Sequence, residues 1–154
     1  MRAGLPQPFR LRRDWYVDET APELDPDEPG IYEWRIEGVG VYVGQYTRRR
    51  RPQRAYGVSV ENCLNGRTYR RGKPFGFRVI HLALARAVAR RELGEEVRIT
   101  LAILENVSDK LVRNRREREL IEQRHRESGQ DGPPILNSGP KPPLPPTPWP
   151  PAPR

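Results

Sequence analysis

The stretches that decide the fold are Gly30–Trp34 (GIYEW) and Val39–Gly44 (VGVYVG). Both are rich in aromatic and β-branched residues, which favour strands. Glu37-Gly38 lies between them and is a turn signal, so we expect the two stretches to form a β-hairpin. In that hairpin, Tyr32 and Tyr42 bring two phenolic hydroxyls to one end of a sheet.

The rest of the chain alternates between helical and strand periodicity. Ser108 is the expected N-cap of the last helix, with Asp109 placed against the positive end of its dipole. Gly94 is expected to end the preceding helix. In chain order, the expected elements are strands at about 31–36 and 39–43, helices at 55–64 and 77–93, a strand at 97–103 and a charged helix that reaches about residue 126.

This order predicts an α+β fold, in which a small mixed or antiparallel three-stranded sheet is flanked by helices. We expect residues 1–28 to form a loosely packed lead-in and residues 29–138 to form the domain. Residues 139–154 hold half of the 18 prolines, so we expect a disordered, polyproline-like tail. A stiff, soluble extension is the favoured role of this tail, and docking on a protein partner is the alternative.

The formal charge of +8 favours a polyanionic partner, with nucleic acid ahead of a membrane surface. The positive charge is clustered at Arg48–Arg51, at Arg67–Lys73 and along Lys110–Arg126. Cys63 is the only cysteine, which excludes an intrachain disulfide and a cysteine-based zinc site. The sequence has no apolar stretch of transmembrane length, so a cytoplasmic protein with no membrane partner is expected.

The two tyrosine tripeptides, Gly30-Ile31-Tyr32 and Tyr42-Val43-Gly44, resemble the opening motif of the GIY-YIG nuclease family, with Val43 in place of an isoleucine. The resemblance extends over residues 29–138, because the family's core has the element order β-β-α-α-β-α. It implies site roles for Tyr32 and Tyr42, although tyrosines on strands are often only part of a core.

The resemblance also implies a metal ligand on the last helix. Glu117 is followed at the third and fourth positions by Leu120 and Ile121, which matches the register of the family's metal-binding glutamate. A hard cation such as Mg²⁺ or Mn²⁺ takes oxygen ligands, often one or two carboxylates with water and substrate phosphate. Glu119 is the alternative ligand, and an ordinary helical ion pair with Arg113 or Arg124 is the alternative role for Glu117.

The family's pattern also points to residues outside the tripeptides and the last helix. Asn137 follows prolines at the end of the domain and resembles the asparagine that buttresses the site, and an ordinary turn asparagine before Ser138-Gly139 is the alternative. The family's phosphate-neutralising arginine falls near Pro52, so Arg54 is the candidate and Arg51 its alternative. Tyr56 is a further candidate general base. His81 is a weaker candidate, because a lone histidine on an amphipathic helix is more often a packing residue. The family often has a lysine, a serine or another polar residue just after the second glycine, where this chain has Gln45.

The implied function is a Mg²⁺-dependent endonuclease that hydrolyses phosphodiester bonds in DNA. The alternative is a catalytically silent DNA-binding protein with the same fold. A homodimer is one way in which such an enzyme would cut both strands. Tyr32, Tyr42, Arg54, Glu117 and Asn137 are the expected catalytic residues, and the expected DNA contacts are Arg48, Arg49, Arg50, Arg51, Lys110, Arg113 and Arg124.

Overall fold

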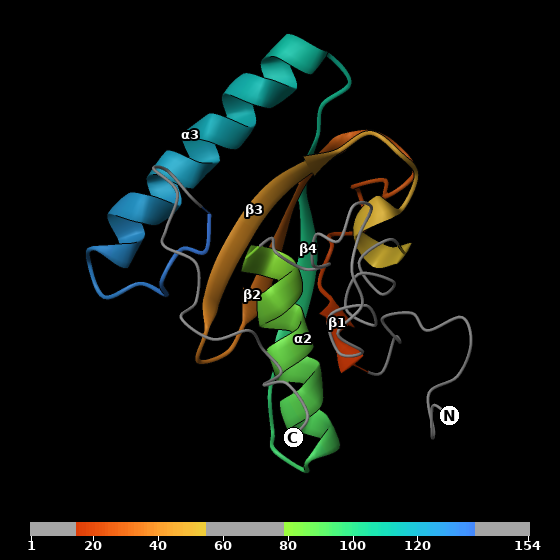
Figure 1. The fold of residues 1–154 in the computed structure, drawn as a ribbon. Helices are drawn as coiled ribbons and strands as arrows, with labels where there is room; N and C mark the ends of the chain where they lie inside the picture. The colour runs from red at the N-terminus through yellow and green to blue at the C-terminus, as the bar shows by residue number, and fades with distance from the viewer. Residues whose placement is uncertain (1–14, 55–78, 138–154) are drawn as a thin grey trace, which may run out of the picture.

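A computed structural model of the chain describes residues 15–54 and 79–137. Its centre is a four-stranded mixed sheet with the strand order β1-β4-β2-β3 (Figure 1). Strands β2 and β3 form the expected antiparallel hairpin, β4 pairs antiparallel with β2, and β1 pairs parallel with β4. The strands are β1 (Val17–Asp18), β2 (Gly30–Ile36), β3 (Gly40–Tyr46) and β4 (Ile99–Asn106).

The prediction of an α+β fold is confirmed, whereas the predicted count of three strands is wrong. The extra strand, β1, has only two residues, too few to show an alternating pattern in the sequence. It belongs to the segment expected to be a lead-in. Beyond β1, the backbone N–H of Glu19 donates to Leu101, and the hydroxyl of Thr20 accepts from the backbone N–H of Ile103.

Helix α2 (Val79–Glu92) packs on one face of the sheet and buries the larger part of the core. Every second residue of β2 contributes to this core, from Tyr32 through Trp34 to Ile36. Tyr16 meets the ring of Trp34 edge to face, with 5.3 Å between the ring centroids. Burial of this apolar surface is the main force that holds the hairpin to α2.

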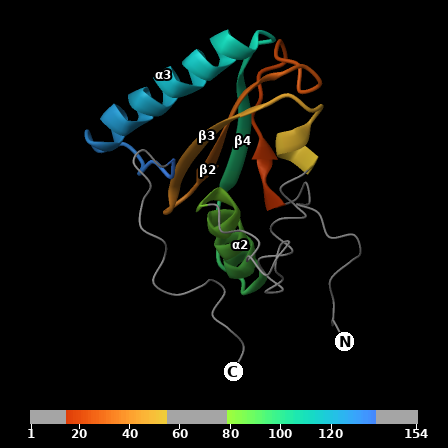
Figure 2. The same ribbon diagram turned by 45° about the horizontal axis from the view of Figure 1, so that its top comes forward.

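Helix α3 (Lys110–Ser128) packs on the other face, where Leu120 meets Ile31 and Val43. In Figures 1 and 2, α3 lies beside β3, the strand at one edge of the sheet. The prediction of Ser108 as its N-cap is wrong by one residue. Asp109 caps the helix, and its carboxylate accepts from the backbone N–H of Val112 at 2.9 Å.

An ion pair between Glu33 and Arg124 ties the hairpin to α3. The Nε atom of Arg124 lies 2.6 Å from Oε2 of Glu33, and the two side chains are 12% and 5% exposed. Arg35 pairs with the other carboxylate oxygen at 2.7 Å. Because a buried carboxylate without a partner is costly, this pair fixes which face of α3 meets the sheet.

The segment from Pro134 to Asn137 covers part of the outer edge of β3. The backbone N–H of Val41 donates to Pro134, and the backbone N–H of Leu136 donates back to Val41. A parallel bridge joins Val41 to Ile135. Through these contacts the chain that follows α3 satisfies backbone groups of an edge strand that would otherwise be open.

Tyr46, at the end of β3, gives a pH-dependent stability that can be measured. Burial raises the pKa of its phenol from about 10 to about 12. Both folded and unfolded states carry a neutral phenol below pH 10, so stability is complete there. Between pH 10 and about pH 12 only the unfolded state ionises, and we expect the free energy of unfolding to fall by about 2–3 kcal/mol. Urea unfolding across this range would show the loss, and Tyr46→Phe should remove it. An equal loss in Tyr46→Phe would contradict the assignment.

Several predicted features lie outside the described residues. They are the helix at 55–64 with Tyr56 and Cys63, the basic segment Arg67–Lys73, the tail at 139–154 and most of the lead-in. The side chain of His81 also lies outside the description, although its position in α2 is given. No helix among the described residues is long and apolar enough to cross a membrane.

Candidate functional site at the outer edge of strand β3

A cluster of four polar side chains joins α3 to the end of β3. Gln45 is at its centre: the amide nitrogen donates to Asn114 at 2.7 Å and, more weakly, to Glu117 at 3.4 Å. The amide oxygen of Gln45 accepts from Nε of Arg113 at 2.9 Å. Arg113 also donates to the carbonyls of Val107 and Ser108, so the residues that precede α3 hold its guanidinium in place. We call Gln45, Arg113, Asn114 and Glu117 the Gln45 cluster.

The electrostatic environment of Glu117 is that of a partly buried carboxylate without an ion-pair partner among the described residues. Burial raises the pKa of Glu117, while hydrogen bonding from Gln45 and the charge of Arg113 lower it. Glu119, the alternative metal ligand, is half-exposed and paired with Arg116. Of the two carboxylates, Glu117 is therefore the one that is partly buried and hydrogen-bonded to the sheet.

Asn137 binds the backbone of β3 two residues away from Gln45. Its amide oxygen accepts from the N–H of Val43 at 2.8 Å, and its amide nitrogen donates to the carbonyl of the same residue at 2.6 Å. In strand β3, alternate residues direct their backbone groups outward. The outward backbone groups of Val41 bond to the chain after α3, and those of Val43 bond to the amide of Asn137. The outward backbone of Gln45 faces Glu117.

The hairpin tyrosines rise from the face of the sheet opposite the Gln45 cluster. Tyr32 is buried in the core beside α2, and Tyr42 is half-buried, with 6.4 Å between the two ring centroids. Tyr32 lies directly over Gly44, where an added Cβ would come within 2.4 Å of the phenolic oxygen. The second glycine of the motif therefore makes room for the tyrosine of the first tripeptide. The tyrosines and Glu117 therefore lie on opposite faces of β3 and do not share one groove.

The expected DNA-binding cations fall into two structural classes. Arg113 is buried in the Gln45 cluster and Arg124 is paired with Glu33, so neither presents a free guanidinium to DNA, in contrast to the expectation. The others are exposed: Lys110 at the start of α3, and Arg48, Arg49, Arg50 and Arg51 after β3.

Arg54, the expected phosphate-neutralising residue, is exposed in a helical turn at residues 51–54. That turn and α3 lie on opposite sides of the sheet in Figures 1 and 2. The structure therefore does not bring Arg54 or Arg51 to Glu117. Arg113 is the cation whose charge acts on Glu117.

The donor atoms of the Gln45 cluster suit a hard divalent cation. One carboxylate and neighbouring amide oxygens are the ligand types that Mg²⁺ accepts, with water and substrate completing the shell. Over the described ranges, no three His, Cys, Asp or Glu side chains are arranged so that together they could hold a metal ion. Any cation held here therefore has Glu117 as its one carboxylate ligand from this cluster.

The sequence reasoning missed Gln45 and Asn114 as site residues. Strand alternation contained a signal for the first, because Gln45 shares a face with Val43 and that face packs against the last helix. Asn114 lies three residues before Glu117, a spacing that places two helical side chains on the same face.

Replacing Asn137 tests its role as the buttress of the site. Asn137→Ala removes both hydrogen bonds to Val43, and we expect the free energy of unfolding to fall by about 1–2 kcal/mol. Asn137→Asp should cost at least as much, since it places a carboxylate against the carbonyl of Val43. Urea unfolding of the three proteins measures both effects. Equal stability of all three would mean that water replaces the amide without loss.

The chain was compared with models of protein families, with curated proteins and with solved structures, and none of them matches. The functional argument therefore starts from the geometry of the β3 edge and from the residues that lie there.

Proposed function

We propose that this chain is a metal-dependent DNA endonuclease of the GIY-YIG type, which hydrolyses phosphodiester bonds. One observation carries the proposal: the separate parts of the motif meet on three consecutive residues of β3. Asn137 binds Val43, Tyr32 covers Gly44, and Glu117 faces Gln45. These parts come from segments that are up to about a hundred residues apart, and a purely structural hairpin has no need to gather them.

In the proposed site, DNA binds at the edge of β3 beyond the segment that covers Val41. Glu117 lies on one side of this edge strand and Tyr42 on the other. Tyr42 is the more exposed of the two hairpin tyrosines, and it is the group proposed to accept the proton of the attacking water. Tyr32 positions the strand through Gly44 rather than touching substrate.

The residues proposed to hold a Mg²⁺ or Mn²⁺ ion are Glu117 and the amide oxygen of Asn114. When bound, the metal would polarise the phosphate and stabilise the charge on the leaving 3′ oxygen. Arg113 contributes positive charge to the same site and keeps Gln45 in place. The products expected from this reaction carry 5′-phosphate ends.

The second candidate is a DNA-binding protein of the same fold that does not cleave. Two observations favour it: Tyr32 and Tyr42 face away from Glu117, and the helical turn at residues 51–54 lies across the sheet from α3. Both candidates predict DNA binding that weakens as salt is added, because phosphate contacts release counterions. Only the first predicts a covalent change in the DNA.

Incubation with supercoiled plasmid and with branched DNA, in Mg²⁺ and in EDTA, separates the two candidates. The proposal expects nicked or linear products in Mg²⁺ alone, and ligation of the products should show their 5′-phosphates. Tight binding without cleavage of either DNA would support the second candidate. Cleavage that persists in EDTA would contradict the metal-dependent mechanism.

A further inference from the structure

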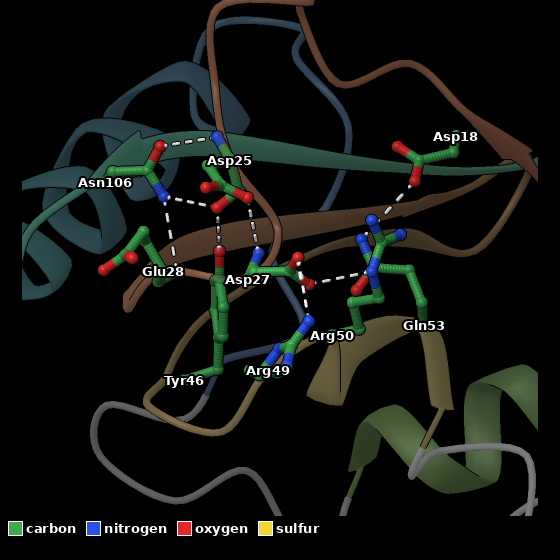
Figure 3. Close-up of polar contacts among 9 residues, drawn as sticks. All are labelled: Asp18, Asp25, Asp27, Glu28, Tyr46, Arg49, Arg50, Gln53 and Asn106. Carbon is green, nitrogen blue, oxygen red and sulfur yellow. Dashed lines mark hydrogen bonds and ion pairs between the residues drawn. The ribbon is translucent and has the colours of Figure 1, made fainter.

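Two of the four consecutive arginines after β3 are held by a carboxylate of this same chain. Asp27 directs one oxygen to Nε of Arg50 at 2.8 Å and the other to Nη2 of Arg49 at 3.2 Å. Figure 3 shows the carboxylate facing both guanidinium groups. The hydrogen bond from Arg49, together with the charge of both arginines, lowers the pKa of Asp27, so it is ionised at neutral pH.

The loop that carries Asp27 is fixed on the end of the sheet. The backbone N–H of Asp27 donates to the side chain of Asp25, which forms a local turn. Asn106, the last residue of β4, accepts from the N–H of Asp25 and donates to its carbonyl, both at 2.8 Å. Tyr46 donates to the same carbonyl (Figure 3). Asp27 is thus presented by a loop tied to two strands.

The backbone of Arg50 is held to this loop as well. Its N–H donates to the carbonyl of Pro26 at 2.9 Å. Its φ of 52° lies in the left-handed region that favours glycine, at a cost of about 1 kcal/mol for other residues. This geometry directs the guanidinium of Arg50 toward Asp27, so the pair of arginines is arranged before any ligand binds.

We propose that Arg49 and Arg50 form a binding site for one phosphodiester of a nucleic acid, and that Asp27 occupies this site until the nucleic acid displaces it. Here two arginines bind two oxygens of one carboxylate. A phosphate can bind the same pair of arginines, because it also offers two anionic oxygens. Arg49 is 75% exposed and Asp27 31% exposed, so solvent and phosphate reach the pair. Exposed ion pairs are weak, and a polyanion can therefore replace the carboxylate.

This inference rests on the nucleic-acid binding that both candidate functions share, and it does not depend on cleavage. Its consequence is that Asp27 lowers affinity, because its charge neutralises two arginines and repels the incoming phosphate. In the described part of the chain, Arg48 and Arg51 form no ion pair. They are available for the first encounter with DNA, and Arg49 and Arg50 follow when Asp27 is displaced.

Asp27→Asn tests the inference, with Glu23→Gln as the matched control. Both variants remove one negative charge from the same segment, but Glu23 is exposed and forms no ion pair among the described residues. Binding of a short fluorescein-labelled duplex is measured by anisotropy at low salt. We expect Asp27→Asn to bind about fivefold more tightly than the native chain, and Glu23→Gln to change affinity by less than half of that. Thermal unfolding checks that each variant is folded.

The same measurement in an Arg49→Gln/Arg50→Gln background makes the test specific. There, Asp27→Asn should give no gain, since the arginines that it would release are gone. Equal gains from Asp27→Asn and Glu23→Gln would overturn the inference and show only an effect of net charge. If Asp27→Asn binds the duplex no more tightly than the native chain, the inference is wrong but the proposed function stands. If no variant binds DNA, both are wrong.

Discussion

Glu117→Gln is expected to reduce Mg²⁺-dependent DNA cleavage by at least about 10²-fold while leaving the protein folded. The variant removes the only carboxylate of the Gln45 cluster, so a divalent cation loses its charged ligand. The fold should tolerate the change, because burial already raises the pKa of Glu117 and thus favours the neutral form. Cleavage rates and thermal unfolding of the native and variant proteins measure the two effects.

Glu119→Gln is the control for that prediction. Glu119 lies on the same helix but is half-exposed and paired with Arg116. Its variant should retain cleavage close to that of the native chain. If Glu119→Gln loses cleavage while Glu117→Gln retains it, the metal ligand is Glu119. The Gln45 cluster would then have no role in the mechanism.

Arg124→Met is expected to lower the free energy of unfolding by about 3 kcal/mol. It leaves Glu33, which is 5% exposed, without the guanidinium that faces it from α3. Removing one partner of a buried pair costs about 3–5 kcal/mol, and Arg35 keeps the loss near the lower end by remaining on the other oxygen. Urea unfolding monitored by tryptophan fluorescence gives the value.

Two further variants show whether the loss comes from the unpaired carboxylate. Glu33→Gln/Arg124→Met removes both charges, and we expect it to recover more than half of the stability. Arg126→Met changes an exposed arginine of the same helix and should cost less than about 0.5 kcal/mol. A double variant as unstable as Arg124→Met would mean that packing of the arginine stem, not its charge, holds α3 in place.

The sequence predicts the hairpin well because its signals are local. Aromatic and β-branched residues on both sides of Glu37-Gly38 indicate two strands and a turn, and the observed strands begin and end within three residues of the expected positions. Strand β1 could not be predicted from the sequence, because the contacts that form it are not local. Val17–Asp18 is too short for a pattern, and its pairing with β4 is set by contacts about eighty residues away.

The roles of the arginines are not predictable from the sequence either. Helix α3 carries arginines on all sides, and only Arg113 and Leu120 are buried. Which arginine turns inward is decided by the carboxylate or amide that meets it from the sheet: Gln45 for Arg113, and Glu33 for Arg124. Neither partner can be identified until the register of α3 against the hairpin is known.

The most direct test of the proposed site is to locate Mn²⁺ on the ¹⁵N-labelled protein by paramagnetic broadening of its NMR signals. The proposal predicts that a low concentration of Mn²⁺ broadens the signals of Gln45, Asn114 and Glu117 first. It also predicts that excess Mg²⁺ restores them and that Glu117→Gln abolishes the effect. First broadening at the acidic loop around Asp25 and Asp27, or none near Gln45, would contradict a metal site at the edge of β3.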